Sequence, residues 1–442
     1  MTETNKRAAA PLDLLQDLVA RARRAGADAA DAVVFESTSL SHGRRLGKTE
    51  KLERSEGEDL GLRVFIGRQQ AIVSSTDRSP AALSDLVGRA VAMARAVPED
   101  PFCGIADPAE IARDWPSLDM LDPEEPAPEV LIERARAAEE AALAVAGVTN
   151  SEGAEAGWGR SRVMLAASNG FAGFYAGSSQ GVSASVIAGS GTRMERDYDY
   201  SSAIYAADLR DPAEVGRSAG ERAVKRLGTK KMPTCRCPVV FDPRVARSFI
   251  SHLLGATSGP AIARRTSFLQ DRLGEQIFPE AITIIDDPHR RRGLRSKPFD
   301  GEGIANRRRA IIDRGVLTTW LLDLRSARQL SLKTTGHAAR GTASPPSPGA
   351  TNVWIEPGPL SPKALIADIR SGFYVTELMG MGVNGVTGDY SRGAAGFWID
   401  KGEIAFPVSE MTVAGNLKDI FARIVAADDL EFKTGVDSPT LR

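Results

Sequence analysis

Cysteine is scarce in this chain of 442 residues, which excludes a disulfide-stabilised fold. The chain has three cysteines, Cys103, Cys235 and Cys237. A structural zinc site needs about four ligands, so the close pair is expected to enter a strand as two free thiols. An excess of charge is missing too, because the formal net charge is -1. We therefore expect no general attraction to nucleic acid or to an anionic membrane.

Long apolar runs are also absent. No stretch of about 18 apolar residues occurs, and the N-terminal residues lack the apolar segment of a signal peptide. We therefore expect a cytoplasmic protein with no membrane partner. Hydrophobic residues make up 42% of the chain and charged residues 26%, which is the composition of a globular protein. The length exceeds that of one ordinary core, so two or three domains are expected.

The order of predicted helices and strands divides the chain into three parts, with the fold class α+β. Residues 1–115 predict an N-terminal region with an antiparallel sheet and flanking helices. Residues 116–232 predict a central helix and an antiparallel sheet region packed with the N-terminal domain. The Pro- and acid-rich stretch 97–127 between them is interpreted as a linker or a surface excursion. Residues 233–442 predict a C-terminal β-rich, barrel-like domain.

The stretch 239–264 predicts a strand, a tight turn and a helix. Val239–Phe241 is β-branched and aromatic, Asp242 suits an N-cap, and Pro243 suits the first helical position. Apolar residues then recur at helical spacing, which predicts one buried face. Gly255 or Gly259 is expected to end the helix.

This helix could carry the two histidines and the glutamate of a zinc peptidase, but it lacks them. The candidate positions hold Ser251, His252 and Ala256. None of the four histidines stands at helical spacing from another, so no helical metal pair can form. Ser251 and His252 are adjacent, and neighbours on a helix point about 100° apart, so they cannot share a proton. A packing role is the default expectation for His252.

Three other motifs have a functional and a structural interpretation. Gly380–Gly385 matches a dinucleotide-binding fingerprint, but no helix pattern follows it, so a hairpin turn is favoured. The basic cluster within 289–309 could hold an anion, although a solvated loop is favoured. Thr335, His337 and Arg340 lie in a polar, glycine-flanked stretch that predicts an exposed loop. That loop either binds a peptide carboxylate or a partner's surface, or is a plain connection.

Several strings in the third part resemble the TldD/PmbA family, and within it the PmbA (TldE) branch. They are DLRSARQLSLKTTGHAARG, TNVWIEPG, GDYSRGAAGFWI and PVSEMTVAGN. The resemblance covers nearly the whole chain. It implies that the catalytic branch, TldD, is a zinc peptidase with an H-E-x-x-x-H motif after this kind of strand, turn and helix, plus a cysteine ligand near the C-terminus.

This sequence departs from that motif in either of two registers. In the first, Ser251 and Ala256 take the histidine positions and His252 takes that of the glutamate. In the second, His252 is retained, and Leu253 and Thr257 replace the glutamate and the second histidine. The last twelve residues, EFKTGVDSPTLR, contain no cysteine. The resemblance therefore implies no catalytic residue and no zinc in this chain, with zinc expected in the partner subunit only.

The leading hypothesis is a non-catalytic subunit of a heterodimeric metallopeptidase, paired with a TldD-like catalytic subunit. It would help hold small or unfolded polypeptides, for example by strand addition. The resemblance also implies an association with DNA gyrase modulation, which the residues themselves do not show. One alternative is an autonomous non-metal hydrolase with Ser251, Ser331 or Thr335 as its nucleophile. Another is a homodimeric peptide-binding protein without catalysis.

Overall fold

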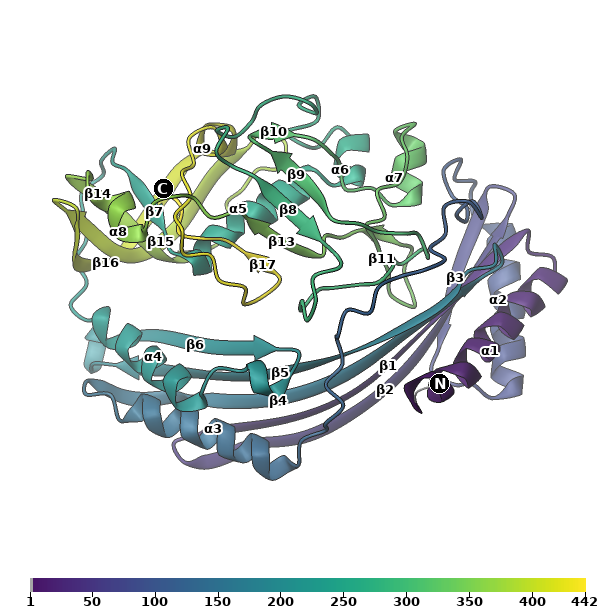
Figure 1. Cartoon of the computed structure of the whole chain (residues 1–442), viewed down its shortest axis with the longest axis horizontal. Helices are drawn as coiled ribbons and strands as arrows, with labels where there is room; N and C mark the ends of the chain where they lie inside the picture. The colour runs from purple at the N-terminus through teal and green to yellow at the C-terminus, as the bar shows by residue number, and fades with distance from the viewer. Residues whose placement is uncertain (1–2) are drawn as a thin grey trace.

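The computed structural model describes residues 3–442, and its largest feature is a curved six-stranded antiparallel sheet (Figure 1). The strand order is β3-β2-β1-β4-β5-β6. The strands are β1 (Ala29–Arg45), β2 (Lys48–Ile66), β3 (Gln69–Ser75), β4 (Val148–Ala167), β5 (Ala172–Ala188) and β6 (Glu195–Ala203). β1 pairs with β4 from Asp31 to Arg44, so the N-terminal and central parts of the chain share one sheet.

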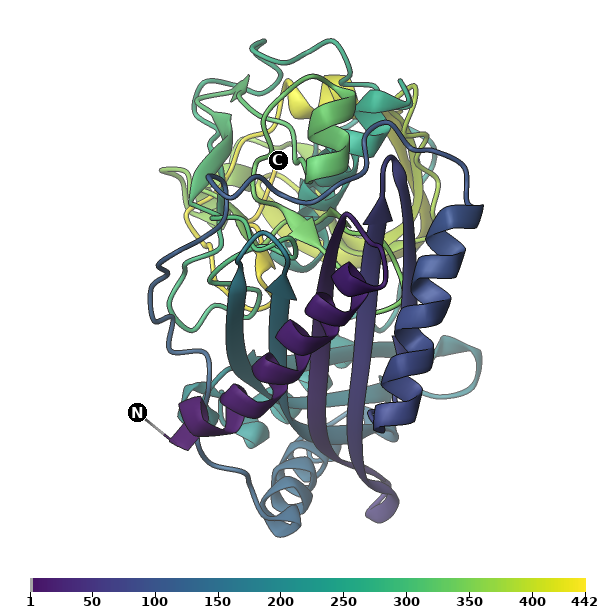
Figure 2. The ribbon, with the colours of Figure 1, turned by 90° about the vertical axis from the view of Figure 1, so that its right-hand side faces the viewer.

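Four helices cover the convex face of this sheet (Figures 1 and 2). They are α1 (Glu3–Arg24), α2 (Pro80–Ala96), α3 (Pro128–Leu143) and α4 (Pro212–Lys225). α1 and α2 bury an apolar face against β1 and β2, and α3 and α4 do the same at the other end, against β4 and β5. Two short 3₁₀ turns, η1 (Gly191–Arg193) and η2 (Ala206–Asp208), flank β6.

The C-terminal region fills the concave side of the sheet (Figure 1). It contains two sheets, with strand orders β10-β9-β8-β13-β17 and β16-β15-β14-β7, and the small hairpin β11–β12. Its strands are β7 (Val239–Phe241), β8 (Ile284–Asp287), β9 (Arg309–Asp313), β10 (Val316–Leu317), β11 (Ala338–Ala339), β12 (Ser347–Pro348), β13 (Asn352–Ile355), β14 (Ser371–Met379), β15 (Asp389–Asp400), β16 (Glu403–Asn416) and β17 (Val436–Asp437). Its helices are α5 (Pro243–Ala256), α6 (Gly259–Ala263), α7 (Leu324–Gln329), α8 (Pro362–Ile366) and α9 (Leu417–Phe421). One hydrophobic core joins α5 to both sheets.

The α+β class and the sheet-rich C-terminal region are confirmed. Within residues 3–442 the two C-terminal sheets are open, so the barrel-like domain that the sequence predicts is not a closed barrel. Among these residues, none of the helices combines the length and the apolar character that a membrane crossing requires.

Residues 97–127 run over the surface from α2 to α3, and most of their side chains are exposed or half-buried (Figure 1). The backbone of this stretch is held on both sides. Met120 O accepts from Ser178 N–H at 2.8 Å, on the side of the six-stranded sheet. On the other side, Ala112 N–H donates to Gly303 O at 2.8 Å. This surface segment is therefore anchored to both the large sheet and the C-terminal region.

Candidate functional site

The helix α5 forms as the sequence predicts. Asp242 is its N-cap, and the carboxylate accepts from Arg244 N–H at 3.0 Å. Pro243 occupies the first turn, where a missing N–H leaves no hydrogen bond unmade. The helix ends at Ala256, between the two glycines expected to stop it, and Thr257 is the C-cap.

The two faces of α5 have opposite character. The inner face is buried in the C-terminal core and consists of Ala246, Phe249, Ile250, Leu253 and Ala256. The outer face carries Arg244, Arg247, Ser248 and Ser251, which recur at intervals of three and four residues. These polar side chains form one wall of a cavity of about 640 Å³. That volume lies within the range of about 300–1,000 Å³ that is usual for ligand sites.

The other walls of this cavity come from distant parts of the chain. β6 contributes Arg196, Asp197 and Tyr198, and β14 contributes Thr376, Glu377 and Leu378. The cavity is completed by Arg226, Val245, Arg295, Arg392, Thr434 and Val436. We call it the α5 cavity. It lies where the C-terminal region faces the edge of the six-stranded sheet.

Arginine dominates the electrostatics of the α5 cavity. Six arginines line it, against the two carboxylates of Asp197 and Glu377. Both carboxylates are already paired. Arg226 lies 2.5 Å from Glu377, and Arg244 donates to Asp197 at 2.8 Å. Because each carboxylate is already bound to a guanidinium group, neither is available to bind a cation.

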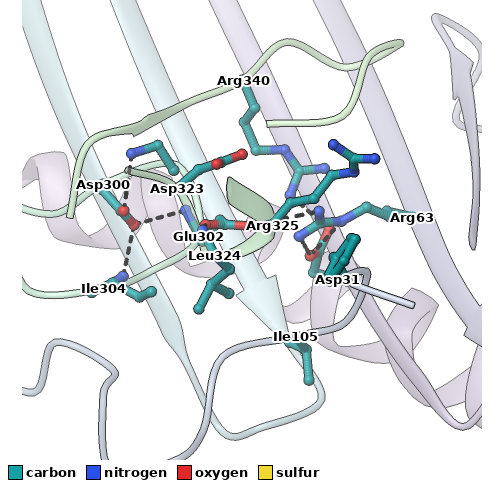
Figure 3. Close-up of polar contacts among 12 residues, drawn as sticks. Asp31, Arg63, Ile105, Asp300, Glu302, Ile304, Asp323, Leu324, Arg325 and Arg340 are labelled. Carbon is teal, nitrogen blue, oxygen red and sulfur yellow. Dashed lines mark hydrogen bonds and ion pairs between the residues drawn. The ribbon is translucent and has the colours of Figure 1, made fainter. Parts of the chain in front are cut away.

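A second polar cluster lies buried between the six-stranded sheet and the C-terminal region (Figure 3). Asp31 on β1 accepts from Arg63 of β2 at 2.9 and 2.5 Å, and from Arg340 at 2.6 Å. Arg63 also approaches Glu302 at 3.9 Å. We call these four side chains the Asp31 cluster. Burial would raise the pKa of Asp31, but Arg340 and Arg63 together hold it below its ordinary value.

Two other carboxyl groups at this interface have a pKa above the ordinary value. The pKa of Glu302 is raised to about 8, and that of Asp300 to about 6, in both cases chiefly by burial. Asp300 accepts from the backbone N–H groups of Glu302 and Ile304 at 2.9 Å (Figure 3). Glu302 accepts from Leu324 N–H at 2.9 Å. Nothing in the sequence marks the burial of these carboxyl groups, because it depends on packing against segments far along the chain.

The loop predicted to be exposed is instead buried at this interface. His337 is 5% exposed, and the side chain of Arg340 is 2% exposed. The expectation of a solvent-facing loop is therefore wrong, because Arg340 is drawn inward by Asp31. Substrate or partner binding by Thr335, His337 and Arg340 stays a prediction. In the structure Arg340 joins the two halves of the chain through Asp31, whereas Thr335 and His337 make their hydrogen bonds within the C-terminal region.

Thr335, His337 and Asp286 form a hydrogen-bonded chain. His337 Nε2 lies 3.1 Å from Asp286, and its Nδ1 lies 2.8 Å from the hydroxyl of Thr335, which donates to Leu322 O at 3.1 Å. Thr335 Oγ1 also accepts from Leu322 N–H at 2.7 Å. Asp286 is fully buried. The contacts thus fix the loop internally, although the order hydroxyl, imidazole and carboxylate is one that nucleophilic catalysis also uses.

Comparison with known proteins identifies the family. A model of the PmbA/TldA metallopeptidase domain 1 matches residues 30–94, one of the central domain matches 121–227, and one of the C-terminal domain matches 234–442. The chain belongs to the TldD/PmbA family. It is 41% identical to metalloprotease PmbA of Escherichia coli O157:H7, over 92% of this chain and 89% of that protein. This places it in the PmbA (TldE) branch.

Other members of the family share its sequence and its fold. The Haemophilus influenzae PmbA homolog is 36% identical, over 95% of this chain and 92% of that protein. A crystal structure of a proposed modulator of DNA gyrase from Bacteroides thetaiotaomicron superposes with a TM-score of 0.90. It is 28% identical and covers 100% of this chain and 97% of its own. TldE from Thermococcus kodakarensis has the same fold, with a TM-score of 0.86, 20% identity and coverage of 97% and 98%.

The positions of the metallopeptidase motif can now be located in this TldD/PmbA chain. Ser251 lies on the wall of the α5 cavity, whereas Ala256 is 6% exposed and belongs to the core. His252 is half-buried, with its ring 6.0 Å from that of Tyr390. Burial, and secondarily Arg392, lowers the pKa of His252. In the second register, Leu253 and Thr257 are fully buried, so neither register directs all three side chains into the cavity.

The residues of the α5 cavity do not fit a catalytic zinc ion. Zinc takes about three protein ligands in such sites, from histidine, cysteine and carboxylate side chains. Within residues 3–442, no group of three such side chains could hold a metal ion. The C-terminal segment, which the family resemblance links to a cysteine ligand, contributes Thr434 and Val436 to the cavity wall. Guanidinium groups, moreover, repel a dication.

The remaining sequence motifs lie in different parts of the structure. Gly380–Gly385 lies in the turn between β14 and β15 and starts no helix, so the nucleotide-binding fingerprint is not formed, as expected. Cys235 and Cys237 are free thiols, and burial raises the pKa of Cys237 to about 11. The basic cluster is divided between different contacts: Arg292 pairs with Asp119 at 2.7 Å, whereas Arg295 lines the α5 cavity.

Proposed function

We propose that this chain is the non-catalytic subunit of a two-chain metallopeptidase that acts on small or unfolded polypeptides. The proposed partner is a TldD-like chain, which would supply the zinc ion, the general base and the activated water. One observation carries the proposal. The helix that would present the metal ligands presents Arg244, Arg247, Ser248 and Ser251 to its cavity instead.

The relatives are consistent with a place in proteolysis. The Escherichia coli relative is named a metalloprotease, and the sequence similarity spans nearly all of both chains. A subunit that has the peptidase fold but lacks the ligand set can contribute shape and binding surface, because these depend on the scaffold and not on the metal. The zinc chemistry would then require a second chain with an intact ligand set.

The test is co-expression of this chain with a TldD-like chain from the same organism. We expect one heteromeric complex by light scattering, and hydrolysis of an unfolded casein substrate by the complex alone. A Glu→Gln change in the partner's H-E-x-x-x-H motif should abolish the activity. The matched change here, His252→Ala, should leave most of it, because His252 packs against Tyr390.

Three results would overturn the proposal. The first is zinc-dependent hydrolysis by the isolated chain. The second is failure of the two chains to associate, with this chain found only as a homodimer, which would favour the peptide-binding alternative. The third is chelator-insensitive hydrolysis that Thr335→Ala abolishes, which would make the chain of Thr335, His337 and Asp286 an autonomous active site.

A further inference from the structure

Three arginines in the α5 cavity have no carboxylate partner among the described side chains. Arg247, on α5, donates to the backbone oxygen of Arg244 at 3.1 Å, and its other nitrogens face Tyr200 and the cavity. Arg392, on β15, donates to Met379 O at 3.1 Å. Arg295 is exposed, and its aliphatic stem lies over Gly435. These three guanidinium groups therefore carry uncompensated positive charge into one cavity.

The other arginines of the cavity provide a contrast. Arg226 and Arg244 are paired with Glu377 and Asp197, and Arg196 lies 3.5 Å from Glu152. The unpaired charges are thus not a general property of this surface. They converge from α5, from the loop after β8 and from β15.

Two buried polar atoms in the cavity wall also lack a hydrogen bond among the described residues. They are Thr376 Oγ1 and Arg244 Nε, of which the second lies 3.6 Å from the carboxylate of Asp242, beyond hydrogen-bond distance. Buried polar groups in folded proteins are almost always hydrogen-bonded, since leaving one unpaired costs about 1–3 kcal/mol. Both atoms could be satisfied by a polar ligand in the cavity.

The cavity also borders two strand edges with free backbone groups. β7 pairs with β14 only from Phe373 to Val375, so on that side Thr376–Leu378 has no neighbouring strand among the described residues. Across the cavity, β6 is the last strand of the six-stranded sheet. An unpaired edge can accept an extended peptide by main-chain hydrogen bonds. This favours a polypeptide over a free inorganic anion.

We propose that the α5 cavity binds the C-terminal carboxylate of a polypeptide, with Arg247, Arg295 and Arg392 as its anion-binding residues. Guanidinium groups bind carboxylates through paired, charge-assisted hydrogen bonds. The peptide backbone lies along the free edge at Thr376–Leu378. This inference rests on the proposed function in taking the ligand to be a polypeptide. It requires neither the partner subunit nor catalysis.

The experiment is calorimetric titration of the intact chain with two N-acetylated tetrapeptides of the sequence Gly-Ser-Ala-Ala. One has a free C-terminal carboxylate and the other a C-terminal amide. We expect the acid to bind at one site per chain and the amide to bind at least about tenfold more weakly. Arg295→Ala and Arg392→Ala should each weaken binding of the acid about 10- to 100-fold. Arg392→Lys should recover part of it, because a lysine keeps the charge and loses the fork geometry.

Arg89→Ala is the matched control, since Arg89 is an exposed arginine of α2 that pairs only with Asp85. It should leave the affinity unchanged. Arg295 is exposed and unpaired, so its replacement should preserve folding even if Arg392→Ala does not. Inorganic phosphate is the third titrant, and it should compete weakly with the acid.

Equal binding of the acid and the amide would overturn the proposal, as would binding of phosphate with no binding of either peptide. So would full affinity in Arg295→Ala and Arg392→Ala. If these results came with an active complex with the TldD-like chain, the proposed function would stand and the carboxylate site would fall. If the acid bound as expected and no complex formed, the carboxylate site would stand and the proposed function would be wrong.

Discussion

Asp31 is the single carboxylate that joins Arg63 and Arg340 at the interface between the large sheet and the C-terminal region. The variant Asp31→Asn keeps the shape of the side chain and removes its charge. Three charge-assisted hydrogen bonds of 2.5–2.9 Å are then weakened. Two buried guanidinium groups are then left without a full counter-charge, because Glu302, 3.9 Å from Arg63, has a pKa raised to about 8 and is mostly protonated at pH 7.

Removing one partner of a buried ion pair typically costs about 3–5 kcal/mol, because the other charge stays buried without compensation. We therefore expect Asp31→Asn to lower the free energy of unfolding by about 3–5 kcal/mol. The assay is urea denaturation of the full chain at pH 7, followed by circular dichroism. The control is Asp85→Asn, which breaks an exposed pair on α2 and should change the free energy by less than about 1 kcal/mol.

A double-mutant cycle with Arg340→Met sharpens this test. Because both residues belong to one cluster, the double variant should lose less stability than the sum of the two single variants. The reasoning would be refuted by a loss below about 1 kcal/mol in Asp31→Asn, or by full additivity with Arg340→Met.

Two further predictions concern the same interface. The pKa of Glu302 is raised to about 8 by burial, so between its ordinary pKa of 4.5 and about 8 the folded chain holds a proton that the unfolded chain has released. Stability should therefore fall as the pH rises through this window. The melting temperature of Glu302→Gln should depend less on pH than that of the unchanged chain. The same pH dependence in both would contradict the raised pKa of Glu302. Gly61 lies against the backbone of Thr342, where an added Cβ would collide with a carbonyl oxygen. Gly61→Ala should destabilise the fold by about 1–3 kcal/mol in urea denaturation, whereas Gly88→Ala, on the exposed face of α2 with no atom within 4 Å, should be neutral or stabilise by up to about 1 kcal/mol. Equal effects of the two changes would refute the close approach.

The sequence predicted the elements whose signals are local. The N-cap at Asp242, the helix after it and the strand before it all form as expected. The sequence predicted an antiparallel sheet in the central part of the chain but not the length of β4 and β5, because glycines such as Gly157 and Gly159 weaken strand propensity. In the structure, β1 and β5 pair on both sides of these glycines, so the neighbouring strands keep β4 continuous.

The sequence predicted one part of the candidate site and missed another. The identity of Ser251, His252 and Ala256 was enough to predict the loss of the family's ligand motif. Arg295 lay in the basic cluster within 289–309 that the sequence marked as able to hold an anion, but Arg247 and Arg392 were not recognised, because they are far from it in the chain and meet it only in the folded state. His337 and Arg340 were misplaced for a related reason. A polar, glycine-flanked segment predicts exposure unless a distant partner such as Asp31 draws it inward.

The central claim is that this chain does not hold the zinc ion of a metallopeptidase. Its most direct test is the metal content of the isolated chain and of its complex with a TldD-like chain, measured by plasma mass spectrometry after purification without chelators. We expect far less than one zinc per isolated chain and about one per heteromeric complex. One tightly bound zinc per isolated chain, lost on replacing His252, would contradict it.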